Sequence, residues 1–334
     1  MAVGATNFSS RDVRKGITMR RFSVGLFSMT LGLTIYFSGC SERGDQVMSP
    51  SFSNDKEYFS SVLMNDDFFA TEEPNLEDGD ALPPEYGSGL RKEEAVIVPF
   101  RFGKKIEKVH RSVRYELQGD SVVTATITRT ITGKFIIAGS YNSSATKPDT
   151  VFRKPFVETA TRKAKFVRVA PPGSPPWKGW KLVSLSLIEG GTQTSTPVIN
   201  RLVVYLQTGD SLIVNSPNDY FFQIGKRLHP VPDLHPDDPI KVQVTLMSSN
   251  PDSEVVVLRH GADHDGLNRL RARFHLVSQS PVGASYSRTY EITLRAHKHL
   301  GKFNAVTEAI SHNSIYDDTE AFENNYWGIP YVVR

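Results

Sequence analysis

Cysteine is nearly absent from this chain, because Cys40 is the single cysteine among 334 residues. One thiol cannot form an intramolecular disulfide, so a disulfide framework is excluded. Cys40 also stands at the end of an apolar N-terminal segment, a position that disfavours a catalytic or metal-binding role for its thiol.

The chain also lacks the short motifs that identify common enzymes. It contains no Gly-x-Ser-x-Gly elbow, no phosphate-binding glycine loop, no dinucleotide fingerprint and no His-Glu-x-x-His pair. Scattered serines, histidines and aspartates could still meet in space, since hydrolases on β scaffolds need not carry a motif. The sequence therefore favours a non-enzymatic protein and keeps a hydrolase as an alternative.

Long apolar runs are rare, and the clearest one lies near the N-terminus. Phe22 to Phe37 is a mostly apolar stretch of sixteen uncharged residues that follows the basic head Met19-Arg20-Arg21. A membrane-spanning helix needs about 20 apolar residues, so a cleaved signal peptide is favoured over a permanent span. Residues 1–18 are polar, and we expect residues 1–39 to be leader and signal peptide, with Met19 as the true start.

The apolar run ends in the tetrapeptide Phe37-Ser38-Gly39-Cys40. This tetrapeptide resembles the lipobox of bacterial lipoproteins, in which a cysteine after small residues is lipidated on sulfur before the signal is cut ahead of it. The resemblance implies a covalent lipid on Cys40 and attachment to a membrane through that lipid. Several acyl chains would make this attachment essentially permanent.

The resemblance also implies a location in the cell. Ser41 after the cysteine resembles the outer-membrane sorting pattern, so we expect the protein in the cell envelope at the outer membrane, facing the periplasm or the cell surface. The covalent lipid is the only non-protein group that the sequence implies, apart from a divalent ion that a polar loop leaves open.

Charge is distributed unevenly along the chain. Residues 41–86 hold twelve acids against Arg43 and Lys56, although the whole chain has a net charge of +3. We predict a flexible acidic tether over residues 40–93, because this composition cannot bury enough apolar surface to offset ordering entropy. Its aromatic residues leave docking on the body as a short helix equally open. The remaining basic body favours acidic partners, and nothing in it indicates nucleic acid.

From residue 94 onward, the sequence predicts one strand after another. In Val123 to Thr132, apolar residues alternate with threonines, which is the period of a strand with one face in the core. Gly209-Asp210 is expected to close a hairpin and Tyr326 to Val333 to form a last strand, whereas Asn304 to His312 has helical periodicity. Many short strands without βα alternation predict an all-β, antiparallel β-sandwich.

The Pro-rich segment 225–239 is a candidate domain boundary. It would connect two sandwich domains of the Ig-like kind, residues 94–224 and residues 240–334. One large sandwich with a long connection is the alternative.

A strand with alternating bases is the first candidate binding surface. Its period places four bases on one face and apolar residues on the other: Arg269, Arg271, Arg273 and His275. Pairing with a later strand would extend this patch through Arg295, His297 and His299. It would suit an acidic polysaccharide or another polyanion, unless acids across the strands neutralise it.

Two tryptophans form the second candidate. Trp177 and Trp180 lie in a turn-like segment with two prolines. Exposed, they would offer flat rings for stacking on a glycan; buried, they would pack at the base of a hairpin.

A polar loop is the third candidate, as a site for a divalent ion. His260, Asp263, His264 and Asp265 supply imidazole and carboxylate groups. Their spacing matches no closed metal site, and a polar hairpin turn explains the same residues. An acidic run over residues 317–323 could likewise be a calcium site or a solvated loop.

Together, the anchor, tether and β body predict a membrane-anchored lipoprotein of the cell envelope. Its body would serve adhesion, assembly or ligand binding, with a glycan or an envelope protein as partner. A polysaccharide- or polyanion-binding lipoprotein is the first alternative, and a secreted metal-dependent hydrolase is the second.

Overall fold

The computed structural model describes residues 50–65, 67–70, 78–81, 97–193, 196–224, 230–261 and 269–334. The lipobox with Cys40, the signal peptide and the loop residues Asp263, His264 and Asp265 lie outside the described residues. Residues from Met48 to Arg334 form one compact unit. Within the described ranges, no helix has both the length and the apolar character needed to cross a membrane.

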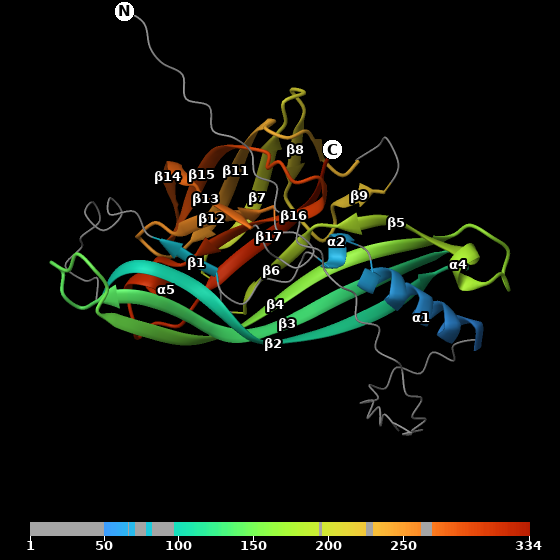
Figure 1. The fold of residues 1–334 in the computed structure, drawn as a ribbon, viewed down its shortest axis with the longest axis horizontal. Coiled ribbons are helices and arrows are strands. Elements are labelled where there is room, and N and C mark those ends of the chain that lie inside the picture. The colour runs from blue at the N-terminus through green and yellow to red at the C-terminus, as the bar shows by residue number, and fades with distance from the viewer. Residues whose placement is uncertain are drawn as a thin grey trace, which may run out of the picture. The chain divides into compact units, whose positions relative to one another are not determined.

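Two β-sheets make up most of this unit (Figure 1). The larger sheet contains β1 (Asp78–Ala81), β2 (Val98–Gln118), β3 (Val122–Ser140), β4 (Thr150–Arg168), β5 (Trp180–Ser186), β6 (Ile188–Thr192), β9 (Phe221–Gln223), β10 (Asp233–Leu234), β12 (Val255–His260), β13 (Leu270–Arg273), β16 (Gly301–Ile310) and β17 (Asn324–Val333). The smaller sheet contains β7 (Val198–Tyr205), β8 (Ser211–Val214), β11 (Pro239–Ser248), β14 (His275–Val282) and β15 (Ser285–Arg295). Short helices complete it: α1 (Pro50–Asn65), α2 (Asp67–Ala70), α4 (Pro176–Gly179) and α5 (His312–Tyr316).

The main core fills the space between the two sheets and confirms the antiparallel sandwich. Strand β11 shows how the sequence builds it, because Ile240, Val242, Val244 and Leu246 alternate with less buried residues and all enter this core. From the larger sheet, Val256 and Leu258 of β12 meet them. The period of two seen in the sequence is therefore the period of burial.

Strands from both sides of residues 225–239 share both sheets. Strand β6 pairs with β17, and β7 pairs with β11. The described residues therefore form one large sandwich rather than two domains separated at the Pro-rich segment.

The long strands β2, β3 and β4 form a ribbon, named here the β2–β4 ribbon, that runs along one side of the unit (Figure 1). One end of its inner face packs on β12 and β16, where Phe135 and Phe156 meet Val255, Val257 and Ile310. Strand β12 thus buries residues on both of its faces. These contacts fix the ribbon against the sandwich.

Helix α1 covers the other end of the inner face. Phe59 and Leu63 are fully buried there, against Val123, Phe166 and Trp180 among others. Residues 50–65 lie in the segment where a tether was expected, and the structure places them in the docked helix that was its alternative.

Two local predictions are wrong. Asn304 to His312 falls mainly in the strand β16, whose central position between two cores buries consecutive residues and hides the strand period. The expected strand that carries Arg269, Arg271, Arg273 and His275 is interrupted at Phe274, where the chain leaves β13 of one sheet and enters β14 of the other.

Candidate functional site

The outer face of the β2–β4 ribbon is the most distinctive exposed surface of the described residues. Strand pairing aligns a row of threonines on β3, and it places Thr126 between Arg114 of β2 and Lys163 of β4. We name this surface the outer ribbon face and define it by these residues: Arg101, Lys105, Glu107, Lys108, His110, Arg114 and Glu116 of β2; Thr126, Thr128, Thr130, Thr132 and Lys134 of β3; Arg153, Val157, Thr159, Thr161, Lys163 and Lys165 of β4.

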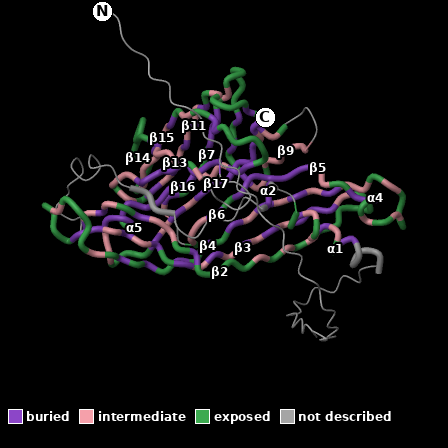
Figure 2. Tube along the Cα trace, viewed as in Figure 1, coloured by how far each residue is buried: buried purple, intermediate pink, exposed green. Residues whose placement is uncertain are grey.

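Positive charge dominates this face. Four lysines or arginines come from β2, one from β3 and three from β4, against two glutamates. Residues 110–116 of β2 alternate between exposed and half-buried, and Figure 2 colours each residue along the ribbon by its burial. Lys105 and Lys108 are exposed, and no ion pair within the described residues holds either of them.

Other cations of the outer ribbon face have weak partners. Lys134 lies 2.9 Å from Glu107, and Lys163 lies 3.3 Å from Asp219. These pairs are open to water, where each contributes about 0–1 kcal/mol, so an incoming anion can replace them. Lys165 lies over the ring of Phe221, 3.9 Å from its centroid.

The arginines predicted to form a basic strand do not form one exposed face. Arg273 lies over the ring of the buried Phe102, and Arg269 lies close enough to Arg259 and Glu308 for their charges to affect it. Burial lowers the pKa of Arg269 to about 10. Because the chain changes sheets at Phe274, His275 pairs with Glu291 in the other sheet. Arg269, Arg271 and Arg273 therefore stay together before the break and are half-buried, whereas His275 is separated from them in the other sheet.

The two tryptophans separate. Trp177 is 67% exposed, whereas Trp180 is 2% exposed and packs beneath helix α1, with Arg168 over its ring. A joint stacking platform is excluded by this burial, and only Trp177 is accessible to a glycan.

Of the four predicted metal ligands, the structure describes only His260, because the other three lie outside the described residues. His260 is buried, and its ring lies 6.0 Å from that of His297. Among the residues that the structure describes, no group of three histidines, cysteines or acids is arranged to hold a metal ion. This holds for the acidic run 317–323 as well, where Asp318 accepts a hydrogen bond from Tyr141.

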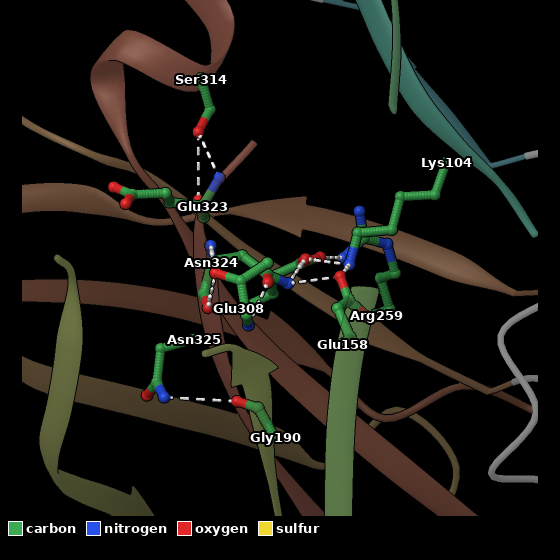
Figure 3. A network of polar contacts seen from close by, with 10 residues as sticks. Lys104, Glu158, Gly190, Arg259, Glu308, Ser314, Glu323, Asn324 and Asn325 are labelled. Carbon is green, nitrogen blue, oxygen red and sulfur yellow. Dashed lines mark hydrogen bonds and ion pairs between the residues drawn. The ribbon is translucent and has the colours of Figure 1, made fainter. Parts of the chain in front are cut away.

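A buried charge cluster that the sequence did not reveal lies under the inner face of the ribbon (Figure 3). Lys104 pairs with both Glu158 and Glu308, Arg259 pairs with Glu308, and Asn324 donates to both carboxylates. Burial raises the pKa of Glu158 against the attraction of Lys104. Burial also opposes ionisation of Glu308, yet Arg259 and Lys104 lower its pKa to about 2. The cluster joins strands of the ribbon to the sandwich.

An apolar pocket between the two sheets contains the two buried histidines. Its cavity volume is about 60 Å³, and its lining is almost wholly apolar. Burial lowers the pKa of His260 to about 4, with repulsion from His297 as a smaller cause. Burial lowers the pKa of His297 to about 4 as well, with repulsion from His299 added and a backbone interaction of His299 opposing it.

These lowered pKa values predict acid sensitivity. Unfolded histidine binds a proton near pH 6.5, whereas folded His260 and His297 do so only near pH 4. Between pH 6.5 and pH 4, the unfolded state therefore binds more protons than the folded state. The free energy of unfolding is highest above pH 6.5 and falls as the pH drops towards 4. We expect a loss of about 1 kcal/mol per histidine between pH 7 and 5.5, measured by urea unfolding. The exposed His110→Gln should leave this slope unchanged, and His297→Phe should reduce it; an unchanged slope in His297→Phe would contradict the assignment.

No protein-family model matches the chain, and no curated protein matches it in sequence.

The outer ribbon face could be predicted only in part from the sequence. The threonine alternation of Val123 to Thr132 is visible there, but the bases beside it come from two other strands. Their alignment depends on the pairing register, including a bulge between Ile106 and Lys108.

Proposed function

We propose that this chain is a lipid-anchored protein of the cell envelope whose β body binds an acidic polysaccharide on the outer ribbon face. The observation that carries the proposal is the excess of lysine and arginine over glutamate on one open sheet face. Carboxylate or sulfate groups would accept charge-assisted hydrogen bonds from these cations, while threonine hydroxyls between them would bond sugar hydroxyls.

The shape of the face favours a linear polymer. Strand β3 has 19 residues, so it spans roughly 60 Å at about 3.3 Å per residue. At one strand spacing, about 5 Å, Thr126 lies between Arg114 of β2 and Lys163 of β4, and Thr132 lies beside Lys108 of β2. A single extended chain lying along the threonine row would therefore meet cations on both sides at Thr126 and a cation of β2 at Thr132.

A lipid on Cys40 would fit this role, because it would hold the body at a membrane next to the polymers of the envelope. Replacing Cys40 by alanine is expected to remove the lipid and release the protein from membranes. Intact mass and membrane fractionation measure both effects. An uncleaved wild-type chain without lipid would overturn the anchor and leave the polysaccharide site to be judged by itself.

The site is tested by reversing two charges, Lys105→Glu and Lys108→Glu, in the detergent-solubilised full chain. We expect binding to polygalacturonate to weaken by about tenfold or more at low salt, since two exposed cations become anions. The wild-type affinity should itself fall steeply between 0.05 and 0.5 M salt, values chosen to shorten the screening length from roughly 14 Å to 4 Å.

The matched control reverses two bases away from the face, Arg201→Glu and Lys298→Glu, which are exposed. Equal weakening in both double variants would show that only net charge matters and would overturn the site. Lysine-dependent binding to phosphatidylglycerol vesicles without binding to polygalacturonate would replace the polysaccharide by a membrane surface.

A further inference from the structure

Helix α1 begins at one end of the β2–β4 ribbon (Figure 1). Near the end of the helix, the Leu63 carbonyl accepts a hydrogen bond from Arg111 in the interior of β2. Nearer its start, the Asp55 carboxylate lies 3.8 Å from the guanidinium of Arg168, the last residue of β4. Pro50, where the helix begins, lies further along the same direction. The start of α1 is therefore at the ribbon end where β4 stops.

This direction limits where a lipid on Cys40 can lie. Cys40 and Pro50 are ten positions apart in the sequence. A fully extended segment of that length spans at most about 35 Å. The proposed lipid would therefore keep a bilayer within this distance of the ribbon end where α1 begins.

The loop between β4 and β5 lies at the same end and carries exposed apolar side chains (Figure 1). It comprises residues 169–179, named here the Trp177 loop, and contains no acid. Trp177 is 67% exposed, and Val169 is 59% exposed. The Val169 amide donates to the Gly179 carbonyl at 2.8 Å and so closes the base of the loop. Large apolar side chains are thus held in water at the end of the ribbon.

The backbone of the Trp177 loop has little freedom. The amides of Lys178 and Gly179 both donate to the Pro175 carbonyl at 2.9 Å, within the single turn of α4. Proline occupies four positions of the loop: Pro171, Pro172, Pro175 and Pro176. Because proline restricts the backbone, the loop loses little conformational entropy when it binds a partner.

The groups around Trp177 suit a lipid surface better than a sugar. Indole rings prefer the boundary between lipid headgroups and acyl chains. Lys178 and Lys181 are exposed near Trp177 in the chain, and such cations attract anionic headgroups. A sugar would need several hydrogen-bonding side chains beside the ring, yet Ser174 and Lys178 are the only others in the loop.

We propose that the Trp177 loop inserts into the interface of a lipid bilayer, as a second membrane contact beside the lipid on Cys40. The inference rests on the proposed anchor, which would bring this end of the ribbon to a membrane. Trp177 and Val169 enter the headgroup region, and Lys178 and Lys181 meet anionic headgroups. Two contacts restrict the rotation of the body about its anchor.

The fluorescence of Trp177 tests this contact in the full chain, reconstituted into vesicles of phosphatidylcholine and phosphatidylglycerol. Trp180 and Trp327 are each 2% exposed, so the difference in emission between the wild type and Trp177→Phe reports Trp177. Lipids brominated on the upper part of the acyl chain should quench this difference signal far more than the emission of Trp177→Phe. A difference signal that brominated lipids spare, while aqueous acrylamide still quenches it, would overturn the proposal.

A charge reversal tests the headgroup contacts. Lys178→Glu with Lys181→Glu should reduce the quenching on these vesicles and shift the Trp177 emission to longer wavelength, because anions next to the loop repel phosphatidylglycerol. The matched control Arg201→Glu with Lys298→Glu reverses two exposed bases elsewhere and should leave both readouts unchanged. Equal effects of the two double variants would overturn the role of the lysines.

The intact mass of the same samples separates the loop from the anchor. A lipidated chain without quenching of Trp177 would keep the anchor and overturn the loop contact. A chain without lipid on Cys40 that still shows quenching would overturn the anchor and keep the loop contact. A Trp177 signal that responds to polygalacturonate but not to vesicles would assign the loop to a glycan and overturn the membrane contact.

Discussion

Replacing Glu308 by glutamine is expected to destabilise the body by about 3–5 kcal/mol, the usual cost of removing one partner from a buried ion pair. Glu308 is 2% exposed and pairs with both Lys104 and Arg259. Its loss would leave two buried cations with Glu158 as the remaining carboxylate of the cluster. Urea unfolding at pH 7 measures the change in the free energy of unfolding.

Two comparisons make this expectation specific. Glu158→Gln should cost less, because burial already raises the pKa of Glu158 and makes its neutral form easier to reach. Glu116→Gln removes a carboxylate from an exposed pair with Arg114 and should change stability by less than about 1 kcal/mol. Equal effects of Glu308→Gln and Glu116→Gln would show that the buried cluster does not hold the ribbon.

Replacing Arg288 by methionine is expected to have an effect of similar size, about 3–5 kcal/mol. The Arg288 side chain is fully buried and pairs with Glu254 at 2.7 Å. It also donates to Gln279 and to the backbone oxygens of Asn250 and Pro251, each at 2.7 Å. Methionine fills similar space, yet it leaves the Glu254 carboxylate buried without its cation.

The Glu254 carboxylate can be removed together with Arg288 in a double variant. If the cost arises from the orphaned carboxylate, the double variant Arg288→Met with Glu254→Gln should recover a large part of it. Arg153→Met, an exposed arginine of the ribbon, serves as the control and should change stability little. Additive losses in the double variant would mean that Arg288 acts through its backbone bonds to the 250–251 turn instead.

The cluster of Lys104, Glu158 and Glu308 bears on function through the ribbon. The inner face of the ribbon packs against the body, held by Lys104, Glu158 and Glu308 at one end and by helix α1 at the other. The opposite, outer ribbon face is therefore left exposed to solvent. A variant that loosens the inner face should therefore weaken polygalacturonate binding without changing any charge on the outer face. This links the stability of the cluster to the proposed function.

Local patterns of the sequence determined the fold class. Strand period, turn residues and the absence of βα alternation are properties of neighbouring residues, so the antiparallel sandwich, the hairpin at Gly209-Asp210 and the last strand could be predicted. The signal peptide and the lipobox are also local patterns, and the lipid on Cys40 stays a prediction.

Partners far apart in the chain were decided only by the tertiary structure. Lys104, Glu158 and Glu308 meet across more than two hundred positions, and the bases of β2 and β4 align with the threonines only through the pairing register. The sequence likewise did not show that the chain changes sheets at Phe274, which divides the predicted arginine strand. Strand period fixes which face a side chain occupies, whereas the neighbours across that face depend on register and sheet order, which no local pattern encodes.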